Sequence, residues 1–216
     1  MRTMFDAIAP RYDLVNRVMT VGMDVGWRRA TVASLGLTPA SLVLDVAAGT
    51  GDLCREIARR GHTAMGVDLS RGMLAHARTV AALVQADALR LPLPAAAVDG
   101  ATCGFALRNV ADLEALFAEL ARVVRPGGRI ALLEVAEPEN TFLRWGHQLY
   151  FNRVMPRIGA LLSDGSAYRY LRRSVAYLPP LAVMTQQLRT AGFSAVERRP
   201  LSAGIAQLLT ATRGDG

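Results

Sequence analysis

Apolar and polar residues alternate along the chain in a way that predicts an α/β fold. Short continuous apolar runs, typical of strands covered on both faces, are separated by segments whose apolar residues recur at helical spacing. Such alternation of strands and helices favours a mostly parallel sheet with helices on both faces. The predicted strands are residues 42–46, 63–68, 84–86, 98–105 and 129–135, and the predicted helices between them are residues 51–60, 71–79 and 112–124.

The pattern in the C-terminal part of the chain departs from this alternation of strands and helices. The segment Arg125-Pro-Gly-Gly128 indicates the end of the preceding helix and a turn, because Pro and Gly commonly follow a helix C-terminus. A helix over 184–191, ended by Gly192, precedes two closing strands over 193–199 and 203–212. These last strands predict a β-hairpin at the sheet edge, so we expect a Rossmann-like, seven-stranded sheet.

Two helical segments flank this pattern within what we expect to be one domain over residues 1–216. Residues 1–40 form the first, with apolar residues near a 3.6-residue period. Residues 137–180 form the second, an insertion of two helical pieces around Pro156 and the segment 163–166. We expect the first to act as a lid over a ligand site and the second to line the part of that site where a substrate binds.

Composition narrows the class of protein. The formal net charge of +7 is carried by arginine alone, and the arginines are scattered and do not interleave with stacking aromatics, which argues against nucleic-acid binding. Cys54 and Cys103 have neither disulfide nor metal-ligand spacing, so we expect no metal and a reducing compartment. The sequence favours a cytoplasmic protein, for which attraction to an anionic membrane surface and homodimer formation both stay open.

The strongest chemical signal is the stretch LVLDVAAGTGD, residues 42–52. Gly49 and Gly51 let a ligand approach the backbone, and Thr50 opens a helix whose free N–H groups favour electron-rich atoms. Asp45 in the strand belongs to the same candidate cofactor-binding set. The third glycine of a dinucleotide fingerprint is missing, and Asp52 stands where pyrophosphate would lie, so a nicotinamide dinucleotide is disfavoured.

Acidic residues end the next two predicted strands. Asp68 lies 17 residues after Gly51 and can accept hydrogen bonds from a ribose diol, while Asp87 can contact an adenine edge. Each acid taken alone is as readily explained as a helix cap. Their order, without a phosphate-binding Lys or Arg at the turn, is typical of class I methyltransferases that use S-adenosylmethionine.

Several longer motifs make the prediction more specific. The motif MFDAIAPRYDLVNRVMTVGMDVGW begins at residue 4, and DVAAGTGDL, CGFALRNV and RVVRPGGRIALLEV follow it. The C-terminal half contains MPRIGALLSDGSAYRYLRRSV and LSAGIAQLLTA. Over nearly its whole length it resembles the ubiquinone/menaquinone biosynthesis C-methyltransferases. The resemblance implies C-methylation of a reduced, prenylated quinone with S-adenosylmethionine as donor. It also implies that Thr50, Asp68, Asp87 with Ala88, and Gly104 bind the cofactor.

Candidates for handling the acceptor's proton are Tyr12, Arg108 and Asn109, with His147 less favoured because it lies in an apolar, aromatic helix. Arginine is a poor base, but Arg108 can stabilise a developing phenolate. The alternatives are structural: Arg108 anchors a carboxylate, Asn109 caps the next helix, and Tyr12 is an ordinary half-buried tyrosine. An aromatic and arginine-rich part of residues 140–180 is either core-facing or a membrane-contacting wall of a prenyl channel.

Together with the resemblance, the arginine-rich, lysine-free composition, which suggests a bacterium with a GC-rich genome, favours demethylmenaquinol as the acceptor. The alternatives are the benzoquinol of the ubiquinone pathway, another small aromatic or lipid acceptor, and a non-catalytic scaffold of a quinone-synthesis complex.

Overall fold

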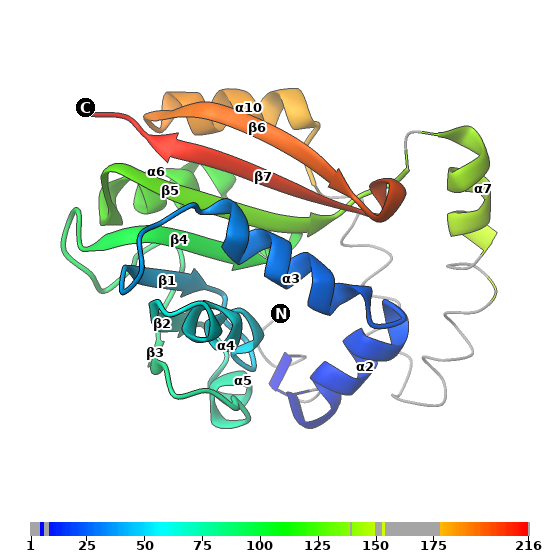
Figure 1. Ribbon diagram of the computed structural model, residues 1–216, viewed down its shortest axis with the longest axis horizontal. Coiled ribbons are helices and arrows are strands. Elements are labelled where there is room, and N and C mark those ends of the chain that lie inside the picture. Colours follow the sequence, from blue (N-terminus) through cyan, green and yellow to red (C-terminus); the bar gives the residue numbers. More distant parts are fainter. Residues whose placement is uncertain (1–4, 7–8, 139, 150–152, 154–177, 216) are drawn as a thin grey trace.

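The computed structural model describes residues 5–6, 9–138, 140–149, 153 and 178–215, and Figure 1 shows their arrangement. One seven-stranded sheet has the order β3-β2-β1-β4-β5-β7-β6. The first five strands in this order pair in parallel, whereas β7 pairs antiparallel with both β5 and β6. The strands are β1 (Leu42–Val46), β2 (Thr63–Asp68), β3 (Ala82–Gln85), β4 (Val98–Gly104), β5 (Val124–Val135), β6 (Phe193–Leu201) and β7 (Ala206–Arg213). The predicted α/β fold and the C-terminal hairpin are confirmed.

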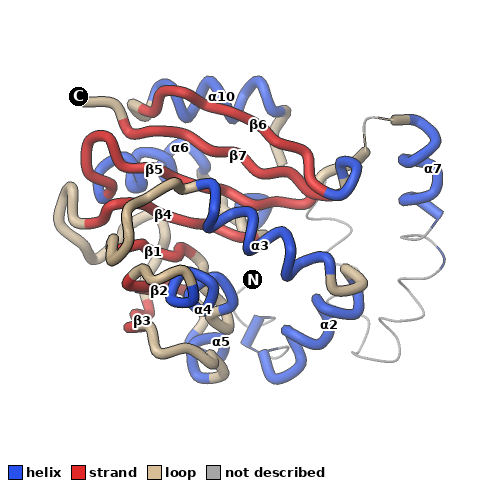
Figure 2. Tube along the Cα trace, viewed as in Figure 1, coloured by secondary structure: helices blue, strands red, loops and turns tan. Residues whose placement is uncertain are grey.

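Helices cover both faces of this sheet, as predicted. Figure 2 shows α3 crossing in front of the strands, with α6 behind them. The α-helices are α2 (Tyr12–Met19), α3 (Met23–Ser34), α4 (Asp52–Arg59), α5 (Arg71–Ala75), α6 (Leu113–Val123), α7 (Thr141–Leu149) and α10 (Leu181–Thr190), and the short 3-10 helices are η1 (Ala9–Arg11), η2 (Leu107–Asn109) and η4 (Ser202–Gly204).

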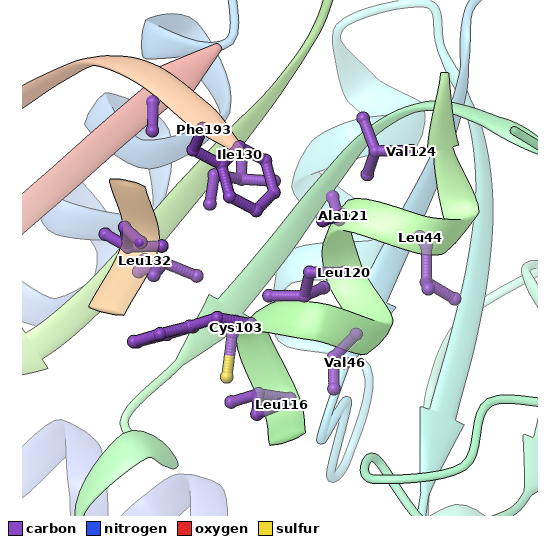
Figure 3. Close-up of a cluster of buried hydrophobic side chains, with 14 of the residues drawn as sticks. Leu44, Val46, Cys103, Leu116, Leu120, Ala121, Val124, Ile130, Leu132 and Phe193 are labelled. Atoms are coloured by element: carbon purple, nitrogen blue, oxygen red, sulfur yellow. The ribbon is translucent and has the colours of Figure 1, made fainter. Parts of the chain in front are cut away.

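The larger hydrophobic core lies between the sheet and the pair α6 and α10. Figure 3 shows side chains of β1, β4, β5 and β6 meeting those of α6 there. On the opposite face, Val43 of β1 packs with Val32 and Leu35 at the end of α3 and with Ile57 of α4. This second contact matters for the site, because it places α3 beside the turn that follows β1.

Several predicted boundaries are wrong, and the reasons are tertiary contacts. The predicted helix over 71–79 ends at Ala75, because the backbone then turns back and the Arg78 N–H donates to the Thr50 carbonyl at 3.2 Å. Strand β5 begins at Val124, not at residue 129, so residues 125–128 belong to an irregular strand rather than to a turn. Gly128 is packed tightly there, since a Cβ on it would lie 2.6 Å from the Asp99 carbonyl oxygen.

The flanking segments agree with the sequence only in part. Residues 9–34 are mostly helical, interrupted at Gly22, whose φ of 77° lies in the left-handed region. In the predicted insertion the structure describes α7, and the predicted pieces around Pro156 and residues 163–166 lie outside the described residues. Within the described ranges, no helix combines the length and the apolar character that crossing a bilayer requires.

Candidate functional site

The glycine-rich turn between β1 and α4 lies at the carboxyl end of the parallel strands, where ligands of such sheets bind. Gly51 has a φ of 81°, and a Cβ on it would lie 2.8 Å from the Cγ2 of Thr79. Gly49 has a φ of 56°, yet a Cβ there would meet no atom within 4 Å. Packing therefore requires the glycine at 51, whereas Gly49 borders space that a ligand can enter.

Asp68 links the tips of the first two strands. One carboxylate oxygen accepts the N–H of Gly49 at 2.8 Å and the other accepts the N–H of Ser70 at 2.8 Å. Burial raises the pKa of Asp68 above its ordinary value of 3.8. A carboxylate offers about four acceptor positions, so Asp68 can also accept hydroxyl groups of a ligand. The structure thus brings together the predicted residues Gly49 and Asp68.

Asp45 has a different position from the other predicted cofactor residues. Its side chain is buried at 1 % exposure inside β1 and accepts hydrogen bonds from the Thr102 hydroxyl at 2.8 Å and from the Cys54 thiol at 3.6 Å. Burial raises the pKa of Asp45 from 3.8 to about 7. We interpret Asp45 as a support that ties β1 to β4 and α4 beneath the turn, while a direct cofactor contact stays a prediction.

The charge around Asp52 differs from the expectation. The sequence predicts no phosphate-binding Lys or Arg at the turn, whereas Asp52 there pairs with Arg28 at 3.0 Å and also with Arg55. Arg28 comes from α3, where it also pairs with the buried Asp24. The packing of α3 on the sheet, which spacing along the sequence does not reveal, brings this guanidinium to the turn.

Two acids of the N-terminal segment reach the same strand tips. The Thr50 hydroxyl donates to the Asp13 carboxylate of α2. The Asp6 carboxylate accepts the hydroxyl proton of Ser70 and the N–H of Gly72, the latter at 2.9 Å. Sequence reasoning missed both acids, and the only signal in the sequence was the expectation of a helical N-terminal lid.

Asp87 and Gly104 stand at the ends of the next strands. Asp87 is exposed just beyond β3, and its carboxylate accepts the N–H of Leu89 at 2.9 Å, so Ala88 lies in a tight turn. Gly104 ends β4, and a Cβ there would lie 2.8 Å from the Cδ1 of Leu53. The structure therefore explains the glycine by close packing against α4, and the cofactor roles of these positions stay predictions.

The segment after β4 has a strained backbone and a buried ion pair. Phe105 adopts a φ of 59°, which is costly for a bulky residue and is common at functional sites. Arg108 pairs with Glu134 of β5, and both side chains are at most 9 % exposed. Arg108 thus does anchor a carboxylate, as its structural alternative stated, and a role toward the acceptor stays a prediction. Asn109 is not the cap of α6, since Asp112 accepts the N–H of Ala115 at 2.9 Å.

The remaining candidates lie on flanking helices. Tyr12 begins α2, is half-buried, and makes an edge contact with Phe5 at 6.4 Å between ring centroids. His147 falls within α7, but its side chain is outside the described residues. In the part of the chain that the structure describes, no three His, Cys, Asp or Glu residues are grouped to hold a metal ion.

Comparison with known proteins decides the family. The profile of the ubiE/COQ5 methyltransferase family matches residues 1–213. The chain belongs to this family. It is therefore a methyltransferase, and S-adenosylmethionine is its methyl donor, as the sequence predicted.

Relatives match along almost the whole chain. The ubiquinone/menaquinone biosynthesis C-methyltransferase UbiE of Syntrophotalea carbinolica is 42% identical, covering 98% of this chain and 93% of that protein. Demethylmenaquinone methyltransferases of Mycobacterium marinum and Deinococcus radiodurans are 43% and 44% identical, covering 95% and 94% of this chain and 90% and 88% of those proteins.

Solved structures agree on the fold. A possible histamine N-methyltransferase of Thermotoga maritima has a TM-score of 0.67 at 18% identity and covers 99% of both chains. Phosphoethanolamine N-methyltransferase 2 of Haemonchus contortus, in complex with S-adenosyl-L-methionine, has a TM-score of 0.64 at 15% identity, covering 88% of this chain and 52% of that one. At such identities the similarity establishes the class I methyltransferase fold and no finer property.

Proposed function

We propose that this methyltransferase acts on a ring carbon of reduced demethylmenaquinone and forms menaquinol. The observation that carries the proposal is the full-length similarity, above 40% identity, to proteins named demethylmenaquinone methyltransferase. One similar relative is named for both the ubiquinone and the menaquinone pathways, so the benzoquinol acceptor is the second candidate.

The cofactor site proposed here follows the strand tips. The ribose hydroxyls bind Asp68, which has acceptor positions beyond its bonds to Gly49 and Ser70. The adenine lies against Asp87 and Ala88, and the methionine end lies over Gly49. This order matches the order of β3, β2 and β1 in the sheet. The next strand is β4, whose last residue, Gly104, lies on the proposed acceptor side.

For methyl transfer to carbon, the enzyme must activate a ring carbon that is a weak nucleophile. When bound, S-adenosylmethionine supplies an electrophilic methyl group on its sulfonium. Loss of the quinol hydroxyl proton would raise electron density at the neighbouring ring carbon, which would accept the methyl group and leave S-adenosylhomocysteine as the other product. The ring carbon then loses its own proton and the ring becomes aromatic again. Arg108 stabilises the negative oxygen, while Asn109 and Tyr12 orient the acceptor.

The flanking helices complete the proposed site. Asp13 and Asp6 fasten the N-terminal segment to the tips of β1 and β2, which supports its role as a lid that excludes water. On α7, Phe142 and Trp145 stack at 6.4 Å and are 76% and 62% exposed. Such exposed aromatic rings suit a prenyl chain or the surface of the membrane that holds it. The homodimer stays a prediction, which light scattering of the purified protein tests.

The proposal is tested by methyl transfer to two acceptors in parallel. Purified protein is incubated with labelled S-adenosylmethionine and either reduced demethylmenaquinone or the reduced demethylated ubiquinone precursor. Label on the naphthoquinol alone supports the proposal, and label on both assigns the enzyme to both pathways. If neither acceptor is labelled while the cofactor still binds, the acceptor assignment is wrong, and a scaffold or another acceptor becomes the better explanation.

A further inference from the structure

A buried carboxylate stands directly behind the candidate residue Arg108. Glu134 lies near the end of β5 with 0% exposure. One of its oxygens accepts a guanidinium N–H of Arg108 and the N–H of Val135, the latter at 2.9 Å. The other oxygen accepts the backbone N–H of Arg108 at 3.3 Å. Glu134 therefore holds both the main chain and the side chain of this arginine.

Stability alone is a weak reason for such a pair. Removing two charges from water costs several kcal/mol for each ion, and replacing a buried ion pair by apolar side chains is often neutral or stabilising. Glu134 follows the core residues Ile130 and Leu132 at a two-residue spacing, so an apolar side chain suits the same face of β5. The presence of a buried carboxylate at this position therefore indicates that Glu134 orients a neighbouring group, which is Arg108.

The backbone around Arg108 does not by itself fix the direction of the arginine side chain. Phe105 donates its N–H to the Leu133 carbonyl at 2.7 Å while its φ stays at 59°, which turns the chain sharply at the end of β4. Arg108 follows in the three-residue helix η2, which is too short to fix a long side chain by itself. The contact of its Nη1 with Glu134, 26 residues further along the chain, holds one end of the guanidinium group.

We propose that Glu134 is a positioning residue for methyl transfer, whose carboxylate holds the Arg108 guanidinium in the orientation that stabilises the oxygen of the acceptor. This inference rests on the proposed function. Since a guanidinium carries five N–H donors in a fixed plane, anchoring one edge sets the direction of the opposite edge. Glu134 itself is fully buried, so its proposed role is to hold Arg108.

The test compares Glu134→Gln and Arg108→Ala, singly and together. We expect Glu134→Gln to lower kcat by about 10- to 100-fold, as misplacement of a catalytic group does. We expect its KM for S-adenosylmethionine to stay within about twofold of the wild-type value, because Asp68 and the turn are untouched. The double variant should be no slower than Arg108→Ala alone, since the two residues act as a unit.

Two further variants make the result decisive. Glu134→Asp keeps the charge on a shorter side chain, so it should recover part of kcat, and it replaces Glu134→Gln if the latter does not fold. Glu119→Gln breaks an ion pair with Arg122 on α6, outside the proposed machinery, and should leave kcat unchanged. If Glu134→Gln and Glu134→Asp both keep wild-type kcat, or if the losses of Glu134→Gln and Arg108→Ala multiply, the inference is overturned.

Failure of the proposed function gives a different result. In that case the wild-type enzyme transfers no methyl group to either quinol, whereas failure of this inference leaves wild-type transfer intact and Glu134→Gln active.

Discussion

Replacing Asp45 by Asn should make the protein more stable at alkaline pH and less sensitive to pH. Asp45 is buried at 1 % exposure, and burial raises the pKa of its carboxyl from 3.8 to about 7. Between these two values the folded protein holds a proton that the unfolded chain releases. The stability that this group contributes is therefore complete below about pH 4 and is lost as the pH rises through about 7.

The size of the effect follows from the pKa. A pKa difference of about three corresponds to about 4 kcal/mol, because one pKa unit is worth about 1.36 kcal/mol. The Asn amide has a similar shape, accepts the Thr102 hydroxyl at its oxygen and cannot ionise. We therefore expect Asp45→Asn to resemble the wild type at about pH 4 and to exceed its free energy of unfolding by a few kcal/mol at about pH 8.

Urea unfolding followed by circular dichroism, at pH values from about 4 to about 8, measures the difference between the two proteins. Asp215→Asn is the control, because it changes an exposed carboxylate near the C-terminus and should follow the wild-type curve. Parallel curves for Asp45→Asn and wild type over the whole range would refute the reasoning, since a buried ionising carboxylate cannot leave the difference independent of pH.

Four further predictions concern the cofactor site and the N-terminal segment beside it. Gly51→Ala should lower stability by about 1–3 kcal/mol, because its Cβ would lie 2.8 Å from Thr79 at a φ of 81°; thermal unfolding measures this loss. The Cβ of Gly49→Ala would meet no protein atom within 4 Å. We therefore expect the variant to lose more free energy of binding to S-adenosylhomocysteine, measured by calorimetry, than free energy of unfolding; unchanged affinity would contradict this. Asp68→Asn should weaken the same binding by about tenfold or more, in keeping with a charge-assisted bond worth about 1.5–3 kcal/mol, and equal affinities would count against a ribose contact. Asp13→Ala removes the acceptor of the Thr50 hydroxyl, so proteolysis within the N-terminal segment should become faster; an unchanged rate would argue against a fastened lid.

The parts of the fold that sequence predicted well are those governed by local pattern. Strands β1 and β2 have their predicted bounds, because a continuous apolar run inside a parallel sheet leaves little freedom at either end. The end of α6 at Val123 also agrees, one residue from the prediction. Where a contact distant in sequence intervenes, the prediction is wrong, as at Arg78, whose hydrogen bond to Thr50 ends the run of helix early.

The candidate site likewise has a part that local spacing predicts and a part that depends on contacts distant in sequence. The turn and Asp68 are identifiable from spacing, since β1 and β2 are adjacent and parallel and so bring their carboxyl ends together. The contacts of Asp13 with Thr50 and of Glu134 with Arg108 span 37 and 26 residues. They depend on how α2 and β5 pack, and no spacing rule carries that information.

The most direct test of the account is the position of the transferred methyl group. The enzyme is supplied with S-adenosylmethionine carrying a carbon-13 methyl group and with reduced demethylmenaquinone, and the product is examined by NMR. We predict that the labelled methyl is bonded to a carbon of the quinone ring. A labelled methyl on a ring oxygen, or release of S-adenosylhomocysteine without any labelled quinone, would contradict it.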